Sequence, residues 1–121
     1  MCRWRDIEGF EGLYKVSDDG FVKRCRRRVG SKYISSAILK PSIITKGSQK
    51  GMFKVNLITK DGKYYNGYVH LIVAKTFIPN PYNYLDIIHL NGCLIDNRVE
   101  NLAWIDRGYK IRKKLHNNAN Y

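Results

Sequence analysis

The chain has 121 residues, which is enough for one small domain with a modest hydrophobic core. Hydrophobic residues make up 44% of it and charged residues 26%, the values of an ordinary globular protein. No apolar run approaches the roughly 20 residues of a membrane-spanning helix, so a transmembrane protein is excluded. The first residues contain no apolar segment typical of a secretory signal. We therefore expect an intracellular protein that is not secreted.

The charge balance predicts a polyanionic partner. Lysine and arginine total 22 against 10 acidic residues, a net charge of +12. The surplus positive charge lies in the two flanking parts of the chain, whereas residues 69–105 are nearly neutral. A surplus of this size on a small domain is typical of nucleic-acid binding. No basic amphipathic helix of useful length is visible, so we expect no membrane partner.

The cysteines indicate a reducing environment. There are three, an odd number, and they lie far apart with no C-x-x-C pair among them. Such spacing argues against a disulfide framework and against a zinc site built on paired cysteines.

In chain order, the first predicted elements are two β-hairpins. Residues 13–16 and 21–24 are short β-like runs separated by Ser-Asp-Asp-Gly, a sequence suited to a tight turn. Residues 53–59 alternate apolar and polar side chains and are followed by an Asp-Gly turn and the aromatic run 64–68. Residues 41–51 are rich in turn formers and predict an exposed loop.

The second half of the chain predicts a mixture of helix and strand. Apolar residues in 69–77 recur at helical spacing, and Pro79 ends the segment. Residues 85–90 and 103–105 are strand candidates, and Asp106 is placed to cap a basic helix that continues to about residue 116. The fold class expected is α+β, a small mixed domain with N-terminal β-hairpins.

Two stretches are similar to known modules. The run W-R-D-I-E-G-F-E-G-L-Y-K-V-S, which begins at Trp4, resembles the N-terminal motif of phage and intron-encoded homing endonucleases. Residues 69–104 include V-H-L-I-V-A, I-H-L-N-G and D-N-R-V-E-N-L-A-W, and they resemble the HNH nuclease module of the same enzymes. The chain is thus similar to the HNH homing endonuclease family over most of its length.

The resemblance implies a domain organisation and a ligand. Residues 1–33 would form the N-terminal nuclease-associated motif, and residues 34–121 an HNH-like module with a ββα-metal core at 85–116. The two parts would form one compact unit. The partner implied is double-stranded DNA, and the source implied is a virus or a mobile element.

The same resemblance suggests roles for individual residues. His89 matches the general base that activates the attacking water, and Asn101 matches the loop asparagine that orients it. His70 matches a family histidine with a packing role. Asn97 and Arg98 match residues that support the loop rather than contact the substrate.

The chain departs from the family at both positions expected to hold the metal ion. The residue before the catalytic histidine, normally Asp or Asn, is Ile88, and the helix ligand, six residues beyond Trp104, is Lys110. A hard divalent cation needs oxygen or imidazole ligands, which neither residue supplies. We therefore expect no metal cofactor and no catalysis. A relocated Mg²⁺ or Mn²⁺ site using Asp86 and Asp106 is the alternative.

Two basic clusters are the expected DNA-binding surface. The first lies at residues 23–28 and the second in the C-terminal helix, and together they comprise Lys23, Arg24, Arg26, Arg27, Arg28, Arg107, Lys110, Arg112, Lys113 and Lys114. Three functions remain open from the sequence. They are a catalytically silent DNA-binding protein, an active metal-dependent endonuclease, and a structural packaging or assembly protein.

Overall fold

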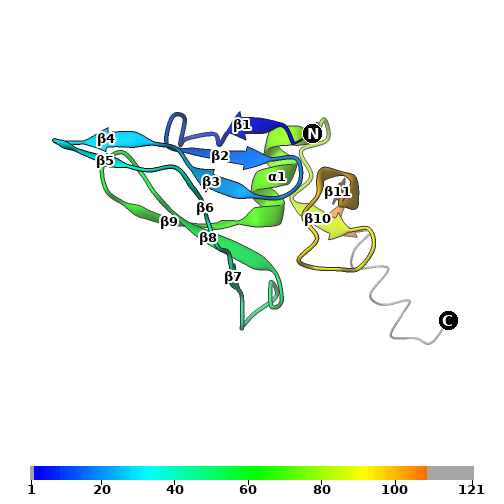
Figure 1. The fold of residues 1–121 in the computed structure, drawn as a ribbon. Helices are drawn as coiled ribbons and strands as arrows, with labels where there is room; N and C mark the ends of the chain where they lie inside the picture. The colour runs from blue at the N-terminus through cyan, green and yellow to red at the C-terminus, as the bar shows by residue number, and fades with distance from the viewer. Residues whose placement is uncertain (1, 109–121) are drawn as a thin grey trace.

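The computed structural model describes residues 2–108, which form strands around one helix (Figure 1). The N-terminal third builds a four-stranded sheet in the order β1–β2–β3–β6, with strands Trp4–Asp6, Tyr14–Ser17, Val22–Arg24 and Ala37–Ile38. Strands β2 and β3 form the first predicted hairpin, with Val16 opposite Val22. That hairpin prediction is confirmed. Strands β1 and β6 are short edge strands that the sequence pattern did not reveal.

A two-stranded ribbon extends from this sheet. Strands β4 (Arg27–Val29) and β5 (Lys32–Ile34) pair only with each other, and Gly30 takes a positive φ of 63° in the turn between them. Figure 1 shows the ribbon at one end of the molecule, away from β10 and β11. The basic cluster predicted at residues 23–28 therefore runs from a sheet strand into a projecting ribbon.

The second sheet has the order β7–β8–β9, with strands Ser42–Ile43, Phe53–Ile58 and Tyr64–Tyr68. Strands β8 and β9 are the second predicted hairpin, with Lys54 opposite Tyr68, so this prediction is also confirmed. The loop expected at residues 41–51 is partly wrong. Ser42 and Ile43 pair with Lys54 and Phe53, because the outer edge of β8 offers them backbone partners.

Helix α1 spans Val69–Phe77, as its apolar spacing predicts. Its apolar face is buried, and the chain leaves helical geometry at Ile78, directly before Pro79. Strand β10 (Asp86–His89) then pairs antiparallel with β11 (Leu102–Ile105), and a short 3₁₀ turn, Val99–Asn101, precedes β11. Both strand predictions are confirmed.

All strand pairs of residues 2–108 are antiparallel, and α1 is the one complete α-helix among these residues, which agrees with the α+β class. Arg107 and Gly108 are helical, as expected after Asp106, but the residues expected to continue this helix, and with them the last part of the expected ββα-metal layout, lie outside the described residues. Asp106 itself accepts a hydrogen bond from the Gly108 amide at 2.9 Å, the bond expected of a helix N-cap. No helix among residues 2–108 is long and apolar enough to span a bilayer.

One hydrophobic cluster joins the N-terminal sheet to the later elements. Val16 and Val22 from the first hairpin belong to the same buried cluster as Leu57, Val73 and Leu102. The β3–β6 pairing also crosses the boundary expected at residue 33. Helix α1 lies between the sheets and the β10–β11 pair, so it fixes where that pair sits (Figure 1).

Candidate functional site

The candidate site begins at the end of β10. Side chains alternate along this strand, so Ile87 and His89 face the core while Ile88 faces the other side. Ile87 and His89 are 6% exposed each, and Ile88 is half-buried. A buried polar ring at a strand end needs a defined hydrogen-bond partner.

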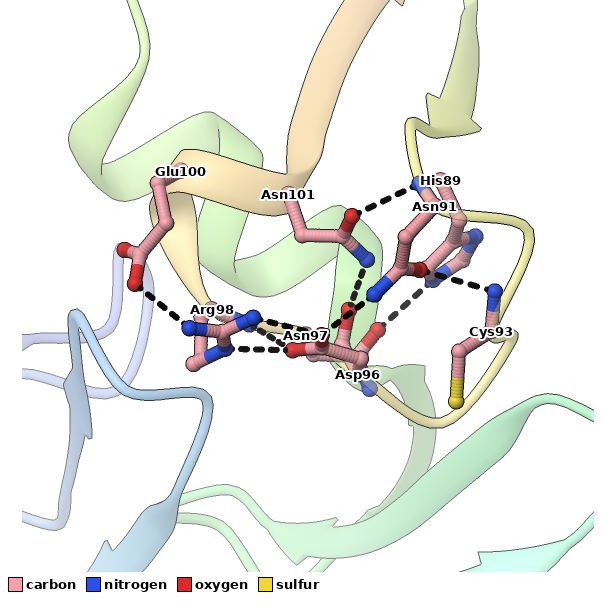
Figure 2. A network of polar contacts seen from close by, with 8 residues as sticks. All are labelled: His89, Asn91, Cys93, Asp96, Asn97, Arg98, Glu100 and Asn101. Atoms are coloured by element: carbon pink, nitrogen blue, oxygen red, sulfur yellow. Dashed lines mark hydrogen bonds and ion pairs between the residues drawn. The ribbon is translucent and has the colours of Figure 1, made fainter.

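Asn97 supplies that partner. Its Oδ1 lies 2.8 Å from Nε2 of His89, and both side chains are buried (Figure 2). Because the amide oxygen can only accept, Nε2 is the donor in this hydrogen bond, so in the neutral ring the lone pair lies on Nδ1. Nδ2 of Asn97 is buried and has no hydrogen-bond partner among residues 2–108. This hydrogen bond therefore selects one tautomer of the neutral histidine ring.

The expected pairing of His89 with Asn101 is not the one in the structure. Asn101 instead joins two backbone segments, because its Oδ1 accepts from the Asn91 amide at 2.9 Å and its Nδ2 donates to the Asp96 carbonyl at 2.8 Å. It shapes the loop, and Asn97 orients the ring. The sequence contains no signal that separates the two asparagines, since both lie within the loop that follows β10.

The loop is also held by a charged cluster (Figure 2). Arg98 donates to both carboxylate oxygens of Asp96, each at 2.8 Å, and to Glu100 at 3.0 Å. Asn91 donates to the same aspartate at 2.8 Å. The hydrogen bonds from Arg98, followed by that from Asn91, hold the pKa of Asp96 well below its usual range.

This pKa shift predicts an acid-sensitive loop. The charged form of Asp96 is favoured in the folded state, so its contribution to stability is present above the unfolded pKa of about 4 and is lost as pH falls below that value. Asp96→Asn should therefore lower the free energy of unfolding at pH 7, and the gap to the parent should shrink at pH 3. Urea unfolding at the two pH values measures both. If the variant and the parent differed in free energy of unfolding by the same amount at pH 7 and pH 3, a stabilising role of the charged Asp96 would be contradicted.

His70, expected to have a packing role, lies in a stack of rings. Its centroid is 5.9 Å from that of Tyr68 and 5.5 Å from that of His89. It is 7% exposed and sits in the first turn of α1. His70 therefore packs against the ring of His89, the candidate base.

The described residues do not fit a divalent metal beside His89. Ile88 offers no ligand atom, and the carboxylates nearest in sequence are already paired with arginines, Asp86 with Arg107 at 3.2 Å and Asp96 with Arg98. Asp86 also lies on the Ile88 face of β10, away from the histidine. One group of potential ligands occurs among residues 2–108, Cys2 with Asp18 and Asp19, and His89 is not part of it.

The predicted basic residues fall into four sets. Lys23 and Arg24 lie on β3, where Lys23 covers the Trp4 ring at 4.3 Å and Arg24 donates to the Ser35 carbonyl at 3.0 Å. Arg26, Arg27 and Arg28 lie at or on the ribbon. Arg107 pairs with Asp86. Lys110, Arg112, Lys113 and Lys114 lie outside the described residues, so the second basic cluster stays a prediction.

The sequence did not single out Tyr33, which completes the basic ribbon. It lies directly opposite Arg28, is 60% exposed, and carries the Arg26 guanidinium 4.6 Å above its ring. The Gly-Ser turn between two short polar runs was the available signal.

The NUMOD4 motif model matches residues 3–70, more than half of the chain. The chain therefore belongs to the family defined by the NUMOD4 motif, which occurs in HNH endonucleases. The family resemblance seen in the sequence is confirmed.

Particular relatives agree with this assignment. The chain is 34% identical over 119 residues to an HNH endonuclease of Acanthamoeba polyphaga mimivirus, covering 95% of this chain and 26% of the relative. It is 29% identical over 113 residues to the DNA endonuclease I-HmuI of Bacillus phage SP01, covering 93% of this chain and 57% of that enzyme. The solved structure of I-HmuI, an HNH homing endonuclease that binds and cleaves DNA, matches with a TM-score of 0.74 at 27% identity. That match covers 96% of this chain and 59% of the solved one, so the chain spans only part of each relative.

Proposed function

We propose that this protein binds double-stranded DNA through the β4–β5 ribbon and does not cleave it. The observation that carries the proposal is the arrangement of Arg26, Arg28 and Tyr33 on one face of a projecting two-stranded ribbon. The membership of a nuclease-associated family supports DNA as the ligand.

The ribbon suits a duplex by shape and by charge. A two-stranded β-ribbon fits the major groove of B-DNA, which is about 12 Å wide. Alternation places Arg28 and Tyr33 on one face, while Arg27 and Lys32 lie on the other. Cations on both faces can reach the phosphates on either side of a groove. Contacts of that kind supply most of the sequence-independent affinity for DNA.

The absence of cleavage follows from the ligand chemistry beside His89. His89, oriented by Asn97, would supply a general base, but a metal ion would still have to stabilise the scissile phosphate and the leaving oxygen. Isoleucine at position 88 and lysine at position 110 supply no ligand for it. The protein would then keep a DNA-binding surface and the histidine, but it would lack the divalent metal ion whose positive charge the reaction needs.

An active endonuclease is the second candidate, and one observation favours it. The hydrogen bond from Nε2 of His89 to Asn97 leaves Nδ1 as the ring nitrogen that can accept a proton, as a general base must. The relatives are also named as endonucleases. In this case the protein would use Mg²⁺ or Mn²⁺ held by a rearranged set of ligands.

A paired assay separates the two functions. We expect the protein to shift a linear duplex in a gel and to leave supercoiled plasmid intact in magnesium or manganese. Nicking that is lost in His89→Ala would replace the proposal with the endonuclease. If the protein neither shifted the duplex nor nicked the plasmid, both functions would be refuted and a structural role would be favoured.

A further inference from the structure

We infer that the turn at Ser17–Gly20 is a positioning element for His89. It presses on the backbone of Asn97 and thereby fixes the amide that orients the histidine ring. The inference extends the proposed function, because the same hairpin leads at its other end into the DNA-binding ribbon.

The contact at Gly20 is unusually close. A Cβ added there would lie 2.8 Å from the Asn97 carbonyl oxygen and 2.9 Å from its carbonyl carbon, distances that real Cβ atoms do not occupy. Gly20 also has a φ of 91°, which disfavours any L side chain. Only glycine lets the turn and the loop approach so closely, and the obstacle is backbone rather than a movable side chain.

A backbone hydrogen bond fastens the two segments beside this contact. The Val99 amide donates to the Asp18 carbonyl at 2.9 Å, two residues after Asn97. The turn itself is held firmly, because Ser17 is fully buried and its Oγ accepts from the Phe21 amide at 3.1 Å. Arg3 further anchors Asp18, with its amide 2.9 Å from Oδ1. The loop therefore rests on a fixed support.

The support acts on the histidine through one residue. Asn97 is 3% exposed, its backbone lies where a Cβ on residue 20 would collide with it, and its Oδ1 accepts from Nε2 of His89 at 2.8 Å. Strand β3 starts two residues after Gly20, and the chain then enters the ribbon at Arg27. Figure 1 shows the ribbon and the β10–β11 pair at opposite ends of this hairpin. The hairpin thus sets how the histidine is oriented relative to the bound duplex.

The β8–β9 hairpin offers a matched control. Its turn, Thr59–Gly62, repeats the hydrogen bonds of the first turn, because Gly62 donates to the Thr59 carbonyl at 3.0 Å and Lys63 donates to Oγ1 of Thr59 at 2.9 Å. Gly62 has a φ of 83°, yet a Cβ there meets nothing within 4 Å. Gly62→Ala therefore imposes the same backbone strain as Gly20→Ala without the collision.

The test measures the free protein by NMR. In Gly20→Ala we expect the ¹⁵N shifts of the His89 ring to move from a single tautomer toward a mixture, and the Val99 amide to exchange roughly tenfold faster. Gly62→Ala should leave both signals at their parent values. A folded Gly20→Ala variant with parent-like His89 shifts and Val99 exchange would overturn the inference.

A milder pair of variants covers the case in which Gly20→Ala does not fold. Ser17→Ala loosens the first turn and Thr59→Ala the second, and only Ser17→Ala should alter the His89 shifts. Equal effects of the two would refute the positioning role. These readouts need no DNA, so failure of the parent to shift a duplex would refute the proposed function while the NMR result still decides the inference.

Discussion

Replacing Arg26, Arg27 and Arg28 together with alanine should weaken DNA binding at every sequence and make it less sensitive to salt. Each phosphate contact releases counterions and adds about 0.9 to the slope of log affinity against log salt, so the loss should be up to about 2.7. Arg26 and Arg28 flank the exposed Tyr33 ring, and all three arginines lie at or on the ribbon. Fluorescence anisotropy over a range of salt concentrations measures the slope.

A charge-matched variant controls for the loss of three positive charges. Lys46, Lys50 and Lys60 are exposed and lie in turns outside the two ribbon strands. Their joint replacement by alanine lowers the net charge by the same amount, so it should weaken binding slightly and leave most of the slope. If both triple variants showed the same slope, the ribbon would not be the interface.

Ligand side chains at the two positions that the family resemblance assigns to the metal should create a metal site. We expect Ile88→Asp combined with Lys110→Asn to bind Mg²⁺ or Mn²⁺ in calorimetry, because a carboxylate and an amide oxygen are ligands that these ions accept. Either substitution alone should do little. An aspartate at 88 would have a lysine in place of the second ligand, and an amide at 110 would lack an anionic partner.

The controls for this design test both charge and chemistry. Ile88→Asn with Lys110→Asn keeps the shape without the carboxylate and should bind the metal far more weakly. Ile88 is half-buried, so a polar residue there should cost about 1–3 kcal/mol of stability. Any regained nicking should vanish when His89 is also changed to alanine. If the parent protein bound Mg²⁺ or Mn²⁺ and His89→Ala abolished that binding, the expectation that no metal binds beside His89 would be contradicted.

The sequence predicted the elements that have a strong local pattern. The helix at 69–77 has apolar residues at helical spacing and a proline after it, and both long hairpins have a turn with Asp and Gly. The strands at 85–90 and 103–105 are short but strongly apolar. In each case local preference and burial act in the same direction, which is why the pattern could be interpreted without tertiary information.

The remaining features depend on contacts that a sequence pattern does not encode. Strand β7 exists because the edge of β8 offers it hydrogen bonds, although its own composition suggests a loop. The choice of Asn97 rather than Asn101 as the partner of His89 depends on how the loop folds back. That path is set by the bonds of Asn101 to Asn91 and Asp96 and by the Gly20 contact. Family resemblance indicated the right loop and the wrong asparagine.

The shared hydrophobic core limits how proteins of this kind can exchange parts by recombination. The family match ends at residue 70, in the first turn of α1, whereas the core continues to Leu102. A crossover at that point would pair the valines of the first hairpin with a foreign helix and leave a mismatched interior. Gene segments inherited together should therefore reach at least from the first sheet to β11, and a crossover tolerated by the fold should fall beyond Ile105.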